Sequence, residues 1–157
     1  MVKNTYSASG WTRLWNCWQP QTPHEQKRTG AVSMSRRRTS KSVQPRRGDI
    51  FYADLRNEGN GGKRGCRPVV IIQNDKGNVN GNSVIVAVVT SAKKKPLPTH
   101  VFLGRQHGLK KPSIATLEDI LTIDKRCLSD YLGTVINTEA DKYLDRAIRI
   151  SLGLERV

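Results

Sequence analysis

Two short, uninterrupted apolar runs constrain the fold of this 157-residue chain more than any other feature. The first reads RPVVIIQ at residues 67–73, and the second reads SVIVAVVTS at residues 83–91. Runs of this length that are rich in β-branched residues and bounded by Gly, Asn or Asp are typical of β-strands. Because both runs are apolar at consecutive positions, each strand must bury both of its faces. The chain is therefore predicted to be mainly β, with a compact, strongly bent sheet or a small barrel.

Three further segments are predicted to extend this sheet. They are GDIFYADL at residues 48–55, KKKPLPTHVFL at 93–103 and PSIATLE at 112–118, and all three contain β-forming residues. The stretch NDKGNVNGN at residues 74–82 is rich in Asn and Gly, so it predicts a turn-rich connection between two strands.

A single amphipathic helix is predicted to close the domain at residues 137–154. Its N-cap would be Asn137 or Thr138, since short polar side chains accept hydrogen bonds from the first free amides of a helix. The residues expected on one face of this helix are Ala140, Tyr143, Leu144, Ala147, Ile148 and Ser151. The predicted fold class is thus mainly β with a C-terminal helix.

The chain carries a formal net charge of +14, which points to a polyanionic partner such as a nucleic acid. Most of the surplus lies near the N-terminus, where residues 1–47 contain ten Lys and Arg and one acidic residue, Glu25. This part is also rich in Ser, Thr and Pro and lacks a sustained apolar period. Residues 1–45 are therefore predicted to be a disordered basic leader, and residues 46–157 are predicted to form the folded domain.

The leader contains three tryptophans, Trp11, Trp15 and Trp18, that would share one face of a short helix. Such a face is compatible with a partner-binding helix or with a helix that lies on a membrane surface. Spurious upstream translation, with the true start at Met34, explains the leader equally well. An Arg-rich, Ser-rich and acid-poor leader also fits an organelle transit peptide. The sequence alone leaves these interpretations open.

The three cysteines indicate neither a disulfide framework nor a metal site. Cys17, Cys66 and Cys127 are widely spaced, and with the three histidines they form no ligand pattern. The sequence also contains no apolar core typical of a secretory signal, and no apolar run of about 20 residues that would span a membrane. We therefore expect a cytoplasmic protein that uses no metal or cofactor and has no membrane partner.

The order of six short blocks resembles one known family. The blocks are RRGDIFYADL, RPVVIIQND, VIVAVVTS, LPTHV, TIDKRCL and AIRISLGL, and they span roughly residues 46–154. They resemble the MazF/PemK family of toxin endoribonucleases of type II toxin-antitoxin systems. The resemblance implies a small SH3-like barrel of the MazF/PemK/CcdB type, a homodimer, and metal-independent, sequence-selective cleavage of single-stranded mRNA. It also implies a cognate antitoxin whose extended tail occupies the RNA groove.

The resemblance assigns catalysis to Arg67 and Thr90. Cleavage through the RNA's own 2'-hydroxyl requires removal of its proton, stabilisation of the charge that builds on the phosphorane, and protonation of the leaving 5'-oxygen. Arg67 follows a Gly-rich loop and would present a permanently charged fork of donors to the phosphate. Thr90, at the end of its strand, would donate to a phosphate oxygen. The alternatives are an arginine that caps a strand end and a threonine that satisfies a backbone group.

Four further residues are expected to bind RNA, namely Lys63, Arg64, Ser91 and Glu118. Many relatives have an acidic residue and a glutamine in the loop where this chain has Lys63 and Arg64, so the lip of the groove is more cationic here. Glu118 would accept from the amino edge of a base, and the alternative is an ordinary surface acid. The glutamine and the later arginine that usually follow this glutamate are replaced by Asp119 and Leu121. Base recognition on that side is therefore not transferable from relatives.

Histidine is the usual proton shuttle, yet neither candidate is placed near Arg67 by the sequence. His100 lies within the strand segment PTHV, and His107 lies in the turn RQHGL. Both histidines are interpreted as structural.

Two other classes of function remain compatible with the sequence. One is a toxin of the same fold that poisons DNA gyrase by protein contact, and the other is a non-catalytic module that binds RNA or DNA. The joint presence of Arg67 and Thr90 favours the enzyme. Cleavage of a fluorogenic single-stranded RNA in the presence of EDTA would separate the enzyme from both alternatives.

Overall fold

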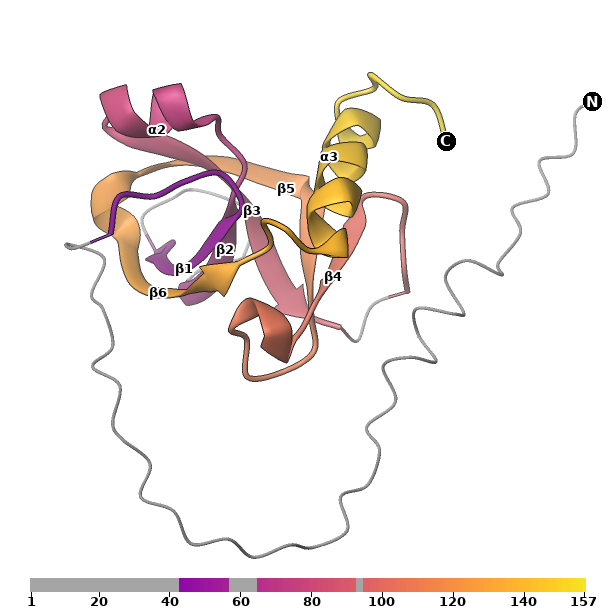
Figure 1. Ribbon diagram of the computed structural model, residues 1–157, viewed down its shortest axis with the longest axis horizontal. Coiled ribbons are helices and arrows are strands. Elements are labelled where there is room, and N and C mark those ends of the chain that lie inside the picture. The colour runs from indigo at the N-terminus through magenta and orange to yellow at the C-terminus, as the bar shows by residue number, and fades with distance from the viewer. Residues whose placement is uncertain (1–42, 57–64, 93–94) are drawn as a thin grey trace, which may run out of the picture. The chain divides into compact units, whose positions relative to one another are not determined.

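The computed structural model describes residues 43–56, 65–92 and 95–157. Within these residues the strands form one six-stranded antiparallel sheet in the order β4-β5-β3-β2-β1-β6 (Figure 1). The strands are β1 (Asp49–Asp54), β2 (Cys66–Ile71), β3 (Ser83–Ser91), β4 (His100–Leu103), β5 (Ser113–Asp124) and β6 (Leu128–Thr134). The helices are α2 (Asp75–Asn80), α3 (Glu139–Ser151) and the single 3-10 turns η2 (Arg105–His107) and η3 (Lys125–Cys127).

The sheet is curled into a half-barrel, with β4 and β6 as its edge strands. Figure 1 shows the long β5 curving around the other strands, and this strand pairs with both β3 and β4. The predicted fold class, a mainly β bent sheet with a C-terminal helix, is confirmed, as are strands in all five predicted segments. The sixth strand, β6, was not predicted, because its half-buried sequence LSDYLGT has no clear apolar alternation.

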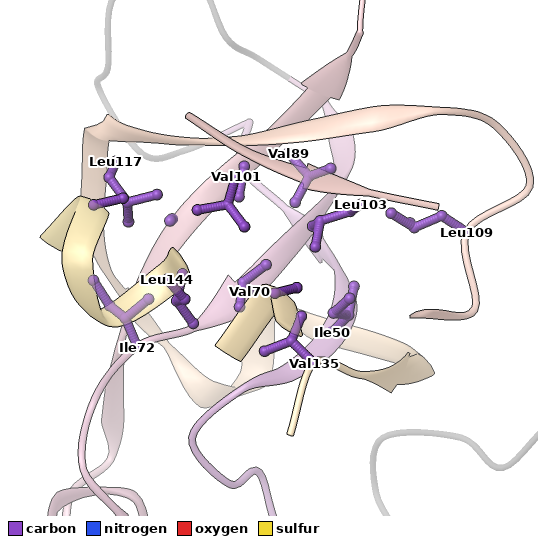
Figure 2. Close-up of a cluster of buried hydrophobic side chains, with 14 residues drawn as sticks. Ile50, Val70, Ile72, Val89, Val101, Leu103, Leu109, Leu117, Val135 and Leu144 are labelled. Atoms are coloured by element: carbon purple, nitrogen blue, oxygen red, sulfur yellow. The ribbon is translucent and has the colours of Figure 1, made fainter. Parts of the chain in front are cut away.

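Both faces of the sheet are covered by apolar side chains, as the two apolar runs predicted. On one face Val70, Ala87 and Val89 pack with Leu144 of α3 (Figure 2). On the other face Val69, Ile71, Val86 and Val88 pack with Phe51 and Leu55. Because side chains alternate along a strand, consecutive apolar residues of β2 and β3 supply two different cores.

The connection at residues 74–82 contains a short helix, α2, where a turn-rich loop was predicted. Asn74 caps this helix, since its side chain accepts a hydrogen bond from the Gly77 amide at 2.9 Å. Asn78 is fully buried and donates to the Gln73 carbonyl at 3.0 Å, while its own carbonyl accepts from Gln44 at 2.7 Å. These contacts stabilise one helical turn in a segment that has little intrinsic helix propensity.

Helix α3 packs on β4 and β5 through Ala140, Leu144 and Ala147, which are buried as predicted. Tyr143, which the period places on the same face, is 41% exposed. Thr138 is the N-cap residue, but its hydroxyl donates to the Val135 carbonyl and caps no helix amide.

The segment that leads into β1 packs against the domain. Pro45 is buried, and Val43 contacts the core formed around Phe51. The predictions for residues 1–42, including the tryptophan face and the start at Met34, lie outside the described residues. In the part of the chain that the structure describes, no helix is long and apolar enough to cross a membrane.

Candidate active site

Arg67 is the second residue of β2, so it lies at the N-terminal end of the strand, directly after the Gly-rich segment. Gly65 precedes the strand with a φ of 101°, a conformation that favours glycine, and its carbonyl accepts from the Leu55 amide at 3.0 Å. This bond joins the two ends of the loop and positions the start of β2. Arg67 is half-buried and pairs with Ala53 of β1.

Thr90 is the penultimate residue of β3 and is half-buried opposite Ile114 of β5. Its Oγ1 is buried and has no hydrogen-bond partner among the described residues. The hydroxyl therefore does not satisfy a backbone group there, which was the alternative to a catalytic role. The same holds for the Nε atom of Arg67, which is also buried without a partner in that part of the chain.

The strand register brings Arg67 and Thr90 to the same end of the sheet. β2 and β3 are paired antiparallel, and Val69 opposite Val88 is the last pair of that ladder. Arg67 and Thr90 each lie two positions further along their strands, so they share the sheet face of this pair. A cation and a hydroxyl thus lie on neighbouring strands, on one face and at the same end of the sheet.

Ser91 is not brought into this arrangement. It is exposed and pairs with Ser113 at the end of β3. Since side chains alternate along a strand, Ser91 is on the opposite sheet face from Thr90. Lys63 and Arg64 lie outside the described residues, in the loop between Arg56 and Gly65.

An ion pair between Arg56 and Asp54 lies at the end of β1, just before that loop. The Arg56 Nε atom donates to Asp54 Oδ1 at 2.9 Å, and its Nη2 lies 2.5 Å from Asp54 Oδ2. These side-chain hydrogen bonds hold the pKa of the Asp54 carboxyl below its usual value. Arg56 is therefore already neutralised, unlike Arg67, for which the described residues supply no ion pair.

Glu118 lies on β5, in a β-bulge between Thr116 and Ile120. Val88 pairs with Thr116 while the preceding Ala87 pairs with Ile120, so residues 117–119 have no direct opposite on β3. Bulges of this kind re-aim side chains and are frequent next to active sites. The Glu118 side chain is 38% exposed.

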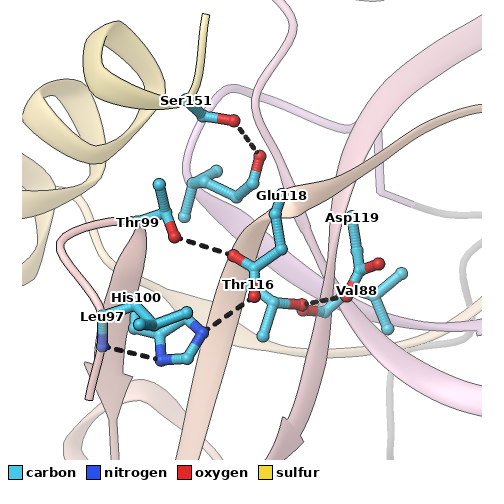
Figure 3. Close-up of polar contacts among 9 residues, drawn as sticks. Val88, Leu97, Thr99, His100, Thr116, Glu118, Asp119 and Ser151 are labelled. Atoms are coloured by element: carbon cyan, nitrogen blue, oxygen red, sulfur yellow. Dashed lines mark hydrogen bonds and ion pairs between the residues drawn. The ribbon is translucent and has the colours of Figure 1, made fainter. Parts of the chain in front are cut away.

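Two hydrogen bonds hold the Glu118 carboxylate (Figure 3). Its Oε1 lies 2.8 Å from His100 Nε2, and its Oε2 accepts from Thr99 Oγ1 at 2.9 Å. Burial raises the pKa of the carboxyl, but the hydrogen bonds from His100, from its own backbone and from Thr99 outweigh that effect, so the pKa is lowered. Glu118 is thus an ionised, acceptor-only group at neutral pH.

Sequence reasoning did not foresee the hydrogen bonds that His100 and Thr99 make to Glu118. His100 was interpreted as structural, and Thr99 and Thr116 were not considered. Thr116 is fully buried, and its hydroxyl lies 3.0 Å from the Val88 carbonyl and 2.9 Å from Asp119 Oδ2. The bulge in β5 and the pairing of β4 with β5 bring His100 and Thr99 to Glu118. Because these residues are far apart in the sequence, no local pattern predicts the contacts.

The described residues contain no group of three or more His, Cys, Asp or Glu side chains that could hold a metal ion. The chemistry available where Arg67 and Thr90 lie is that of a guanidinium and a hydroxyl. Such donors bind an oxyanion, and a phosphate fits them because it offers several oxygens to a planar donor fork. The arrangement is therefore suited to binding a phosphodiester.

The chain is similar to a known protein family and to a named relative. The profile of a family described as PemK-like, MazF-like toxin of type II toxin-antitoxin system matches residues 46–152. A protein named Endoribonuclease MazF from Staphylococcus saprophyticus is 43% identical over 114 residues, which cover 71% of this chain and 94% of that protein.

Solved structures from mycobacterial species are also similar. An endoribonuclease in complex with its cognate antitoxin has a TM-score of 0.59 and 28% identity, and the match covers 71% of this chain and 97% of that one. A second endoribonuclease has a TM-score of 0.58 and 25% identity, with 71% and 93% covered.

Proposed function

This chain belongs to the PemK-like, MazF-like toxins of type II toxin-antitoxin systems, and we therefore propose that it is an endoribonuclease that cleaves single-stranded RNA. The observation that carries the proposal is that Arg67 and Thr90 lie at the same end of one sheet face, each with a buried polar atom that has no partner among the described residues. Such an atom costs about 1–3 kcal/mol of stability, a cost that native proteins tolerate chiefly where the group is used.

In the proposed reaction the RNA supplies its own nucleophile. The 2'-oxygen attacks the adjacent phosphorus as its proton is removed, and the bond from phosphorus to the 5'-oxygen breaks. The leaving 5'-oxygen takes up a proton, so the products are a 2',3'-cyclic phosphate and a 5'-hydroxyl. The chemistry needs no metal, because protein donors can stabilise the charge on the phosphorane.

Arg67 is proposed to stabilise the negative charge on the non-bridging phosphate oxygens. A guanidinium does not lose its proton in a protein, so it acts through charge and hydrogen bonds and not as a base. Thr90 is proposed to donate its hydroxyl hydrogen to a phosphate oxygen. Its place at the end of a buried strand means that little conformational entropy is lost on binding.

Lys63, Arg64, Ser91 and Glu118 are proposed to bind RNA outside the scissile phosphate. Lys63 and Arg64 would contact backbone phosphates, which bind every sequence alike. Glu118 would contact a base, since an ionised carboxylate accepts from exocyclic amino groups. We further propose that the protein is a homodimer and that a cognate antitoxin binds and inhibits it. The antitoxin part is supported by the mycobacterial endoribonuclease solved in complex with its cognate antitoxin.

The test is cleavage of a fluorogenic pool of randomised single-stranded RNA by the full chain in the presence of EDTA. Cleavage products that carry a 2',3'-cyclic phosphate are expected by mass spectrometry. A pool of the same design in 2'-deoxy form should stay intact, because it lacks the nucleophile. Failure of the folded wild-type chain to cut any RNA, or equal cutting of both pools, would rule the proposal out.

A further inference from the structure

His100 is buried to 2% exposure in the edge strand β4, and both of its ring nitrogens are engaged. Nδ1 lies 3.2 Å from the Leu97 amide nitrogen, and Nε2 lies 2.8 Å from Glu118 Oε1. A backbone amide can only donate, so Nδ1 must be the acceptor and must carry no proton. In the neutral ring the proton is then on Nε2, which donates to Glu118. The contact with Leu97 thus selects the tautomer in which Nε2 carries the proton and donates to the Glu118 carboxylate.

The backbone that carries Glu118 is fixed as firmly as its side chain. Ser151 of α3 donates its hydroxyl to the Leu117 carbonyl at 2.5 Å, and the Leu117 amide donates to the Thr99 carbonyl at 3.0 Å. Figure 3 shows the Ser151 bond beside those that His100 and Thr99 make to Glu118. One oxygen of the carboxylate is held by His100 and the other by Thr99, so the plane of the group is set.

Each carboxylate oxygen keeps a second lone pair for another donor. The side chain remains 38% exposed, so the carboxylate is partly open to a ligand. A carboxylate that is fixed before the ligand arrives loses little entropy on binding, and its direction becomes selective.

The register places Glu118 and the candidate catalytic pair on either side of one row of paired residues. His100 pairs with Thr116, Thr116 pairs with Val88, and Val88 pairs with Val69, so these four residues form one row across the sheet. Arg67 lies in the next row on the same face. Glu118 lies in the bulge just past Thr116, on the side of this row away from Arg67, and its strand β5 is two strand spacings, roughly 10 Å, from β2. A short stretch of bound RNA therefore reaches both sites.

We propose that His100 is a positioning residue that holds Glu118 to select a base with an exocyclic amino group a short distance from the scissile phosphate. Adenine, cytosine and guanine each offer such an amino donor. Uracil instead presents one imino donor between two carbonyl oxygens, and these oxygens would face the carboxylate with like partial charge. The inference rests on the proposed function, because it assigns a base preference to the same RNA site.

Two substitutions of His100 separate its two contacts. His100→Gln keeps a side-chain N–H near the position of Nε2 and loses the acceptor for Leu97. His100→Asn keeps an acceptor near the position of Nδ1 and loses the donor to Glu118. If His100 only anchors strand β4, the two variants should behave alike or the Gln variant should be worse. Glu118→Gln is the third variant, since an amide can also donate to a uracil carbonyl.

The experiment incubates each protein with a randomised single-stranded RNA pool and sequences the cut sites, with thermal unfolding as the check of folding. For the wild type we expect uracil to be disfavoured about tenfold at one position near the cut. His100→Gln should keep that preference, whereas His100→Asn and Glu118→Gln should lose most of it. Equal preference in wild type and His100→Asn, or equal loss in both His100 variants, would overturn the inference.

The same pool is also sequenced after equilibrium binding without cleavage, which separates this inference from the proposed function. If the wild type binds with the expected preference but cuts nothing, the proposed function fails and the positioning role stands. If it cuts RNA with no preference that depends on Glu118, the proposed function stands and the positioning role fails. If it neither binds nor cuts RNA, both are overturned.

Discussion

Arg67 and Thr90 each stand two positions beyond the pair Val69–Val88, on neighbouring strands and on one face of the sheet. Arg67 Nε and Thr90 Oγ1 are both buried without a hydrogen-bond partner in the described part of the chain. Stability and activity should therefore respond in opposite directions when these groups are replaced. This opposition distinguishes residues kept for chemistry from residues kept for structure.

Thr90→Val should raise the free energy of unfolding by up to about 1 kcal/mol, because it removes a buried hydroxyl that has no partner. The same change should lower kcat at least tenfold, since a donor to the phosphate is lost. Thr116→Val is the matched control: its hydroxyl contacts the Val88 carbonyl and Asp119, so it should cost about 1–3 kcal/mol. Urea unfolding and RNA cleavage measure both effects. Equal destabilisation by the two substitutions would contradict the prediction.

Arg67→Ala should leave a folded protein whose cleavage rate is lower by about two orders of magnitude or more, as is typical when a preorganised donor is lost. Arg67→Lys keeps the charge but not the planar fork, so we expect it to recover only a small part of the rate. The control is Arg126→Ala, because Arg126 is 89% exposed and follows β5 at the far end of β3 from Thr90. Single-turnover cleavage compares the three variants. A near-normal rate for folded Arg67→Ala would remove Arg67 from the mechanism.

Changing Lys63 and Arg64 together to Ser should weaken RNA binding similarly for unrelated sequences. The dependence of log K on log salt should fall by about 1 to 1.5 units, the value for two lost phosphate contacts on a single strand. KM should rise while kcat hardly changes, because contacts present in both ground and transition states affect binding alone. Lys76 and Lys142, both exposed in the helices α2 and α3, provide a control of equal charge change. Loss of kcat with an unchanged salt slope would assign the loop to the chemistry.

The pH dependence of stability should reveal His107, whose burial lowers its pKa below the usual 6.5. Above about pH 6.5 the ring is neutral in both states, so the folded state has no protonation penalty. As the pH falls from that value towards the lowered folded pKa, the unfolded chain binds more protons and stability is lost. His107→Asn keeps an acceptor for the Gly104 amide, which donates to Nδ1 at 3.1 Å, and should flatten the curve. Urea unfolding from pH 5 to 8 tests this, and parallel curves would contradict it.

Gly108 should be intolerant of a side chain. Its φ is 82°, and an added Cβ would lie 1.8 Å from the Leu132 carbonyl oxygen of β6, which is backbone and cannot rotate away. Gly108→Ala should therefore cost several kcal/mol, beyond the roughly 1 kcal/mol or more of a left-handed alanine. Gly153→Ala is the control, since Gly153 has a φ of 72° but an added Cβ there would meet nothing within 4 Å. Comparable unfolding free energies for the two variants would show that the packing of the β4–β5 connection on β6 is not tight.

Features that depend on neighbouring residues could be predicted from the sequence. The apolar runs at 67–73 and 83–91 predicted two strands buried on both faces, and the 3.6-residue period of 137–154 predicted the closing helix. Side-chain direction alternates with a fixed period in a strand and recurs with a fixed period in a helix, so burial can be read from local order. The same blocks carried the family resemblance and with it the choice of Arg67 and Thr90.

Contacts between residues far apart in the sequence could not be predicted, because they depend on the fold. β6 exists because it pairs with β1 across the chain, α2 exists because Asn78 is held by Gln44 and Gln73, and neither has a strong local pattern. His100 contacts Glu118, which is 18 positions away in the sequence. Ser151 donates to the carbonyl of Leu117, in the same bulge and 34 positions away. Strand register and bulge position depend on the packing of whole elements against one another. A local pattern therefore identifies the strands, while the fold decides which side chains they bring together.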